Sequence, residues 1–186
     1  MGKRHFNFKS LAAILALALL VSGLAGCASG GGLQSAQPAD GKLRIITTIA
    51  QIAEPLAVIG GDRVNVESLM GPGVDPHQYQ AAHSDIQKLA GADAIFYNGL
   101  HLEANMTRAF EEIGKSKPVI AIAEVLPEEK LLRDETGAVD PHVWFDIDLW
   151  KEALAAATEQ LKQLSAEDAE YFEASKKAYF ARLDAL

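Results

Sequence analysis

Two histidines of this chain end the same tetrapeptide. Val-Asp-Pro-His occupies residues 74–77 and again residues 139–142, so that His77 and His142 both follow an Asp-Pro pair. Proline fixes its own φ and keeps the preceding residue extended, so each imidazole is presented from a stiff turn. Imidazole nitrogen is a common ligand of transition metals. The matched pair therefore predicts two metal ligands supplied by one lobe, and two ordinary loop histidines are the alternative interpretation.

Each histidine loop lies between a strand-like run and a helix-like run. Apolar and β-branched runs predict strands at 43–48, 64–70, 94–97 and 118–123. Helical patterns lie between them at 51–59, 84–90 and 103–113, and the second of these begins at a capping box over residues 84–87. Strands that alternate with helices predict an α/β fold, a four-stranded parallel sheet flanked by helices. Ligands of such sheets bind beyond the carboxyl ends of the strands.

After Asp146 the pattern becomes purely helical. Apolar residues recur with four- and three-residue spacing at Trp150, Leu154, Ala157, Leu161 and Leu164. A capping signal at 165–168 predicts a second helix, and neither Gly nor Pro interrupts the pattern before Leu186. We therefore expect a long helix that is cut while still periodic, so that the chain is a fragment.

The amino-terminal residues have the features of an export signal. Lys3, Arg4 and Lys9 form a positive start, and residues 11–21 are almost wholly apolar. The apolar stretch is shorter than the roughly 20 residues that a membrane-spanning helix needs. We therefore predict a signal peptide over residues 1–26.

The signal peptide ends in a sequence that has the form of a lipoprotein box, Leu24-Ala25-Gly26-Cys27. Cys27 is the only cysteine of the chain, so an internal disulfide is excluded and a lipid-bearing first mature residue gives the thiol a role. Residues 27–41 are rich in Gly, Ser, Ala and Gln, which predicts a flexible tether.

The chain is acidic. Its formal net charge is −8, and removal of the three signal-peptide cations changes that to −11. A negative surface argues against binding to nucleic acid and against electrostatic binding to anionic lipid. It suits an extracytoplasmic protein that handles cations.

Three segments resemble the cluster A-I solute-binding proteins of ABC importers for manganese and zinc. In the order and spacing of that family they are 71–79 (Gly-Pro-Gly-Val-Asp-Pro-His-Gln-Tyr), 98–103 (Asn-Gly-Leu-His-Leu-Glu) and 140–146 (Asp-Pro-His-Val-Trp-Phe-Asp). The resemblance covers about residues 43–186. It implies two lobes joined by a long rigid helix, with one transition metal bound between them. It also implies a monomeric, membrane-tethered receptor that is not an enzyme and that delivers the ion to an ABC permease.

The resemblance also implies roles for particular residues. The family's first two metal ligands carry over to His77 and His142, whereas its third (His or Glu) and fourth (Asp) come from a second lobe that this sequence lacks. Residues 42–146 would then be the N-terminal α/β metal-binding lobe. Residues 147–186 would include the start of the connecting helix.

Other residues near the motifs are expected to have no ligand role. We expect His101 to be a packing or surface residue and His83 to be a solvated residue in a first helical turn. Asn98 and Glu103 are expected to be structural. Trp144 and Phe145 are expected to lie in the core under the second histidine loop.

The choice of metal rests on the segment before His142. That segment contains no histidine and carries Glu124, Glu128, Glu129, Asp134 and Glu135. Carboxylate oxygens favour harder ions, so we expect manganese rather than zinc for the whole receptor, with iron still open. With only two imidazoles, this polypeptide itself should bind metal weakly and prefer zinc.

Two other functions remain open. A metal-dependent hydrolase would also use a histidine pair, but the sequence has no His-x-x-x-His with a neighbouring Glu and no evident general base. A surface adhesion protein could use the same scaffold.

Overall fold

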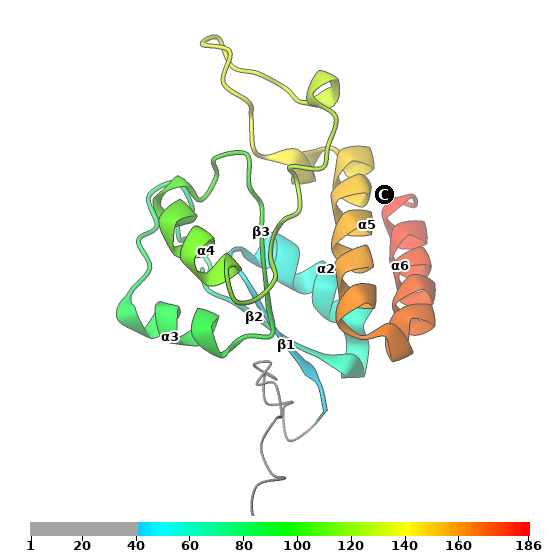
Figure 1. The fold of residues 1–186 in the computed structure, drawn as a ribbon. Coiled ribbons are helices and arrows are strands. Elements are labelled where there is room, and N and C mark those ends of the chain that lie inside the picture. Colours follow the sequence, from blue (N-terminus) through cyan, green and yellow to red (C-terminus); the bar gives the residue numbers. More distant parts are fainter. Residues whose placement is uncertain (1–40) are drawn as a thin grey trace, which may run out of the picture. The chain divides into compact units, whose positions relative to one another are not determined.

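A computed structural model describes residues 41–186, which form an α/β unit around one sheet. Its four strands are β1 (Leu43–Thr47), β2 (Val64–Ser68), β3 (Ala94–Tyr97) and β4 (Val119–Ala121). They lie in the order β2-β1-β3-β4 and every pairing is parallel (Figure 1). The predicted four-stranded parallel sheet is therefore confirmed. The predicted signal peptide, Cys27 and nearly all of the predicted tether lie outside the described residues.

Helices cover both faces of the sheet. They are α2 (Ala50–Gly60), α3 (His83–Gly91), α4 (Thr107–Gly114), α5 (Ile147–Leu164) and α6 (Ala169–Leu183). Figure 1 shows α2, α5 and α6 on one side and α3 and α4 on the other. Within residues 41–186, none of these helices combines the length and apolarity needed to cross a bilayer.

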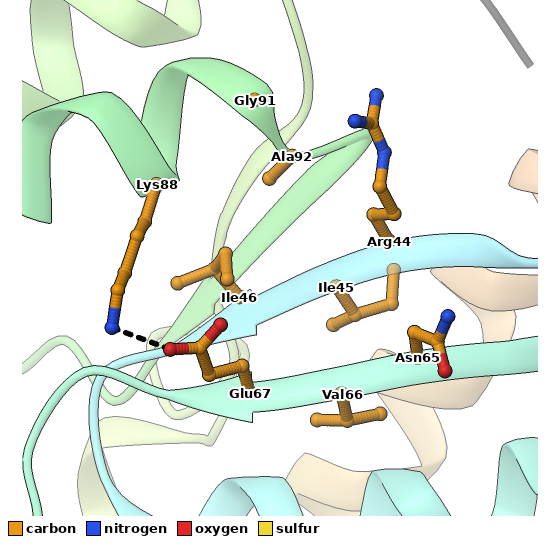
Figure 2. A pocket seen from close by; sticks show the side chains of 9 residues that line it. All are labelled: Arg44, Ile45, Ile46, Asn65, Val66, Glu67, Lys88, Gly91 and Ala92. Carbon is orange, nitrogen blue, oxygen red and sulfur yellow. Dashed lines mark hydrogen bonds and ion pairs between the residues drawn. The ribbon is translucent and has the colours of Figure 1, made fainter. Parts of the chain in front are cut away.

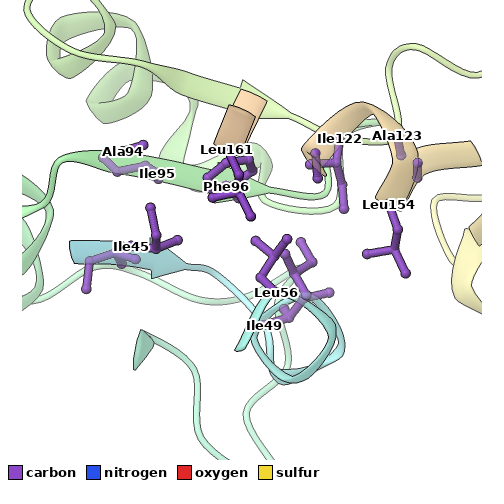
Figure 3. Packing of buried hydrophobic residues seen from close by; sticks show 14 of the residues in the cluster. Ile45, Ile49, Leu56, Ala94, Ile95, Phe96, Ile122, Ala123, Leu154 and Leu161 are labelled. Atoms are coloured by element: carbon purple, nitrogen blue, oxygen red, sulfur yellow. The ribbon is translucent and has the colours of Figure 1, made fainter. Parts of the chain in front are cut away.

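The core is continuous from the sheet into the α2–α5–α6 layer. Residues 94–96 of β3 are all fully buried, because helices cover both faces of a parallel sheet. On α5 the predicted stripe is buried at Trp150, Leu154, Ala157 and Leu161. Figure 3 draws part of this cluster around the central strands. The burial makes the sheet a rigid base for the loops at its carboxyl edge.

The helices after Asp146 form a hairpin. Asp146 caps α5, since its Oδ1 accepts hydrogen bonds from the amides of Asp148 and Leu149, each at 3.0 Å. The chain turns at Ser165, whose hydroxyl donates to Asp168 (2.8 Å), and α6 then packs against α5 and α2. The predicted helical region is confirmed. Its assignment to an interlobe connector stays a prediction.

The predicted start of α3 was wrong. The helix begins at His83 with Ala82 as its N-cap, and the carboxylate of Asp85 accepts from the Ala82 amide at 2.8 Å. The sequence had suggested Ser84 as the cap. The same carboxylate oxygen of Asp85 also accepts from the Tyr79 hydroxyl (2.8 Å), a contact between residues six apart that no capping pattern includes.

Three loops meet at the carboxyl edge of the sheet. We call residues 69–82, which follow β2, the first His loop, and residues 122–142, which follow β4, the second His loop. The β3 loop comprises residues 98–105 and leads from β3 toward α4. It contains the start of the helix predicted at 103–113, which instead opens with a 3-10 turn at Ala104–Met106.

A buried carboxylate holds the β3 loop in place. Oε1 of Glu103 accepts hydrogen bonds from the Thr48 hydroxyl (2.6 Å) and the Asn98 amide (2.9 Å). Its Oε2 accepts from the Gly99 amide at 3.1 Å. The turn that this carboxylate closes has left-handed φ angles at Gly99 (84°), Leu100 (52°) and His101 (64°). The latter two are not glycines, so this conformation costs energy that the surrounding contacts must offset.

The β3 loop in turn holds both His loops. The side-chain amide of Asn98 donates to the carbonyl of Pro141 at 3.0 Å, next to His142. The side-chain amide of Asn105 donates to the carbonyl of His77 at 3.2 Å. One short segment thus fixes the backbone at both histidines.

Replacing Glu103 with alanine should lower the free energy of unfolding by about 2–4 kcal/mol, because three buried donors lose their acceptor. Glu103→Gln should cost less, because an amide oxygen can still accept from Thr48 and Asn98. In that variant only the Gly99 amide faces a donor. Urea denaturation of both variants at pH 7 measures the difference, and equal losses would show that the two hydrogen bonds kept by glutamine contribute little.

A comparison of the unaltered protein with Glu103→Gln tests the charge on Glu103. Burial raises its pKa above the ordinary 4.5, against the lowering effect of its hydrogen bonds. Ionisation of this group therefore favours the unfolded state. The protonated group contributes fully to the stability of the fold below pH 4.5, and this contribution is lost as the pH rises through the raised pKa of the folded state. The stability advantage of the unaltered protein over Glu103→Gln should grow as the pH falls from 7 to 4. A shrinking advantage would mean that the folded pKa is not raised.

Candidate metal centre

His77 and His142 lie together at the carboxyl edge of the sheet, as the duplicated motif predicts. Their Nε2 atoms are 3.4 Å apart, and the ring centroids are 5.4 Å apart at an interplanar angle of 57°. The two rings line a cavity of about 270 Å³, whose other walls include Ile49, Met70 and Trp144. Two loops that are 65 residues apart in sequence thus direct two nitrogen atoms at one point.

The first His loop presents His77 from a turn that its own aspartate closes. Asp75 Oδ1 accepts from the His77 amide (2.9 Å), and Asp75 Oδ2 accepts from the side-chain amide of Gln78 (2.7 Å). Gly73 has a φ of 81°, which favours glycine at that position of the turn.

The second His loop uses its aspartate differently. Asp140 Oδ1 accepts from the His142 amide (3.0 Å) and also contacts Nδ1 of the His142 ring (2.6 Å). The backbone and then the side-chain hydrogen bond with His142 lower the pKa of Asp140, so this group is a carboxylate at neutral pH. A carboxylate only accepts, so Nδ1 of His142 carries the proton and its Nε2 lone pair is free.

The spacing of the two Nε2 atoms fits one metal ion. Nitrogens bound at about 2.0–2.1 Å to a tetrahedral ion are themselves about 3.3–3.4 Å apart. The same spacing also accommodates a hydrogen bond between the rings when one Nε2 is protonated. Among residues 41–186, no group of three or more His, Cys, Asp and Glu side chains could hold a metal. The described residues therefore offer two nitrogen ligands and leave the rest of a coordination shell open.

The other two described histidines lie apart from this pair, as expected. His83 is exposed in the first turn of α3, where its Nε2 is 3.2 Å from the side-chain amide of Gln87. His101 is exposed on the β3 loop. Within the described part of the chain, neither forms a hydrogen bond or ring contact with His77 or His142. That His77 and His142 bind metal, and that the other two do not, stays a prediction.

The expectation for the two aromatic residues after His142 was half wrong. Trp144 is partly buried and lies edge-on to the His142 ring, with centroids 5.2 Å apart. Phe145 is 82% exposed, so it is not a core residue. The reason is the 3-10 turn Val143–Phe145, which directs Val143 into the core and the residue two positions later outward.

Sequence reasoning found some supporting residues and missed others. Asn98 and Glu103 have the structural role that was expected for them. The contact of Asn105 with the first His loop was not foreseen, and neither was the contact of Asp140 with the ring of His142. An Asp two residues before a histidine is the spacing of an Asx turn, and that signal could have suggested the capped turns at both loops.

A second cavity lies over the middle of β1 and β2 and beside α3 (Figure 2). Its charged groups are already paired, Lys88 with Glu67 and Arg44 with Asp93. Its lining contains no histidine and no residue of the three loops at the carboxyl edge. It therefore offers no alternative site with imidazole ligands.

Known proteins share this sequence and fold. Residues 45–186 match the model of the family described as "Zinc-uptake complex component A periplasmic". The manganese-binding lipoprotein MntA of Bacillus subtilis is 42% identical over 158 residues, which cover 84% of this chain and 50% of MntA. The zinc-binding protein TroA of Treponema pallidum is 42% identical over 148 residues, 80% of this chain and 48% of TroA.

The crystallised periplasmic zinc-binding protein TroA of Treponema pallidum superposes with a TM-score of 0.75 at 41% identity, over 78% of this chain and 52% of that one. The chain spans about half the length of these relatives. The resemblance drawn from the three motifs is thereby confirmed. A further relative is the manganese ABC transporter substrate-binding lipoprotein PsaA of Streptococcus anginosus, 33% identical over 188 residues, which cover 96% of this chain and 59% of PsaA. The chain belongs to the family described as periplasmic zinc-uptake complex component A.

Proposed function

We propose that this chain is the N-terminal metal-binding lobe of an extracytoplasmic receptor that captures a divalent transition metal for an ABC importer. The observation that carries the proposal is the convergence of two Nε2 atoms to 3.4 Å from two copies of one motif. The names of the relatives support it, since they include a manganese-binding lipoprotein and a zinc-binding protein. The receptor binds and releases an ion and performs no covalent chemistry.

His77 and His142 are the two ligands that this lobe supplies. Both rings reach the cavity from turns whose backbone is held by the β3 loop, so little ordering remains to be done when the ion arrives. In the complete receptor, a second lobe supplies the remaining ligands and closes over the ion. Residues 147–186 then include the start of the helix that joins the two lobes.

The transported ion of the complete receptor is manganese rather than zinc. The support is chemical: the second His loop carries five carboxylates between residues 124 and 135 and no histidine before His142. Oxygen-rich surroundings suit the harder ion. The lobe by itself should nevertheless prefer zinc, because two imidazoles without further geometric selection follow the general order of affinities.

The receptor works as a monomer at the outer face of the cell membrane and hands its ion to the permease. Cys27 is the attachment point, and residues 27–41 provide the tether. The names of several relatives, such as the substrate-binding lipoprotein PsaA of Streptococcus anginosus, support lipid anchoring. Neither nucleic acid nor an anionic lipid surface is a partner, given the −8 net charge of the chain.

The metal site can be tested by titration. His77→Ala and His142→Ala should each weaken zinc binding at least about tenfold, since even loss of an outer partner of a metal ligand costs roughly 10- to 100-fold. His83→Ala removes an exposed histidine outside the site and serves as the matched control. Isothermal titration with zinc and manganese should give one weak site with zinc bound more tightly. Undiminished binding in both His77→Ala and His142→Ala would place the site elsewhere.

The anchor can be tested separately. Expressed with its signal peptide in a bacterial host, the protein should be recovered from membranes with Cys27 as its first residue and more than one acyl chain attached. One chain gives only marginal membrane binding, so stable anchoring needs more. Intact-mass and peptide mass spectrometry measure the modification, with Cys27→Ser as the control. A free thiol at Cys27, or cleavage at another position, would refute the assignment.

A further inference from the structure

We propose that the two histidines are unequal ligands, with Asp140 as the positioning residue that presets His142 while the ring of His77 stays adjustable. The inference rests on the proposed function, because it concerns how the same pair meets its ion. It is drawn from the hydrogen bonds of the two aspartates, which differ although the tetrapeptides around them are identical.

The His142 ring is held at two places besides its contact with His77. Its Nδ1 donates to Asp140 Oδ1 at 2.6 Å, and Trp144 packs against the ring at an interplanar angle of 78°. The carboxylate partner keeps the proton on Nδ1 and leaves the Nε2 lone pair for a metal. His142 is therefore ready to bind before an ion arrives.

Asp140 is itself fixed by the backbone around it. Its amide donates to the carbonyl of Leu132 at 2.8 Å, and the neighbouring residues Arg133 and Val139 form an antiparallel bridge. The carbonyl of Pro141 accepts from Asn98 at 3.0 Å. The carboxylate and the ring that it orients are thus attached to the same braced segment.

The His77 ring lacks this support. The equivalent Asp75 binds the His77 amide through Oδ1, but its Oδ2 accepts from the side chain of Gln78 at 2.7 Å. Among the described residues, none forms a hydrogen bond with Nδ1 of His77. The residue after each motif differs too. Gln78 donates to the second carboxylate oxygen of Asp75, whereas Val143 at the matching position is apolar and buried.

This inequality gives the two ligands different tasks. The Nε2 of His142 is offered in a fixed position, and the His77 ring, whose Nε2 already lies 3.4 Å from it, makes the small adjustments. An adjustable ring can accommodate the different bond lengths of different ions. Asp140 therefore acts on affinity through the tautomer of His142, whereas Asp75 shapes only the turn.

The test compares Asp140→Asn with Asp75→Asn, the same change in the twin motif. In metal-free protein labelled with ¹⁵N in histidine, NMR reads which ring nitrogen carries the proton. His142 should be protonated at Nδ1, and Asp140→Asn should raise the share of the tautomer protonated at Nε2, because a neutral amide oxygen is a weaker acceptor for Nδ1–H than the carboxylate oxygen it replaces. Zinc affinity should then fall about 10- to 100-fold. Asp75→Asn should leave both the tautomer of His77 and the zinc affinity within about threefold.

The outcomes separate this inference from the proposed function. If His77→Ala and His142→Ala abolish zinc binding, but Asp140→Asn and Asp75→Asn lower it equally with no change of tautomer, the inequality is refuted and the metal site stands. If His142 changes tautomer in Asp140→Asn but zinc binds without either histidine, the positioning role holds and the proposed function fails. Circular dichroism confirms that both variants are folded.

Discussion

The buried carboxylate of Glu103 is the contact on which the arrangement of the three loops at the carboxyl edge of the sheet depends. It accepts three hydrogen bonds, from Thr48 at the end of β1 and from the amides of Asn98 and Gly99 at the end of β3. β1 and β3 are neighbours in the sheet, at the point where the chain changes direction along it. Glu103 therefore joins two strands and at the same time closes the strained turn of the β3 loop. Burial of the charged form costs free energy, and the raised pKa of this carboxyl reflects that cost.

Two amide side chains connect this turn to the His loops. Asn98 reaches the second His loop and Asn105 reaches the first. Neither contact involves a ring nitrogen of a histidine, so both Nε2 atoms remain available. The result is a backbone that is held at both histidines, while the ring of His77 keeps more freedom than the ring of His142.

Much of this could be predicted from the sequence, because strand runs, loop positions and the duplicated Val-Asp-Pro-His are local patterns. The sheet, its flanking helices and the meeting of His77 with His142 follow from those patterns and from the rule for parallel sheets. The errors have local causes too. Phe145 was assigned to the core because a single 3-10 turn has no periodicity to reveal which residue points outward. The N-cap of α3 was placed two residues too late because Asp85 acts as the N3 residue that accepts from the Ala82 amide, and an alanine N-cap carries no side-chain signal. The unequal use of Asp75 and Asp140 could not be predicted, because the two tetrapeptides are identical and only side-chain geometry shows which ring meets its aspartate.

X-ray absorption at the zinc edge tests the metal assignment most directly, because it reports the number and type of the ligands of the bound ion and their distances from it. The zinc-loaded protein should show two imidazoles at about 2.0–2.1 Å, with oxygen ligands in the remaining positions. The double variant His77→Ala/His142→Ala should lose the imidazole signal completely. A spectrum of the loaded double variant that still contains two imidazoles would contradict the assignment of the site to His77 and His142.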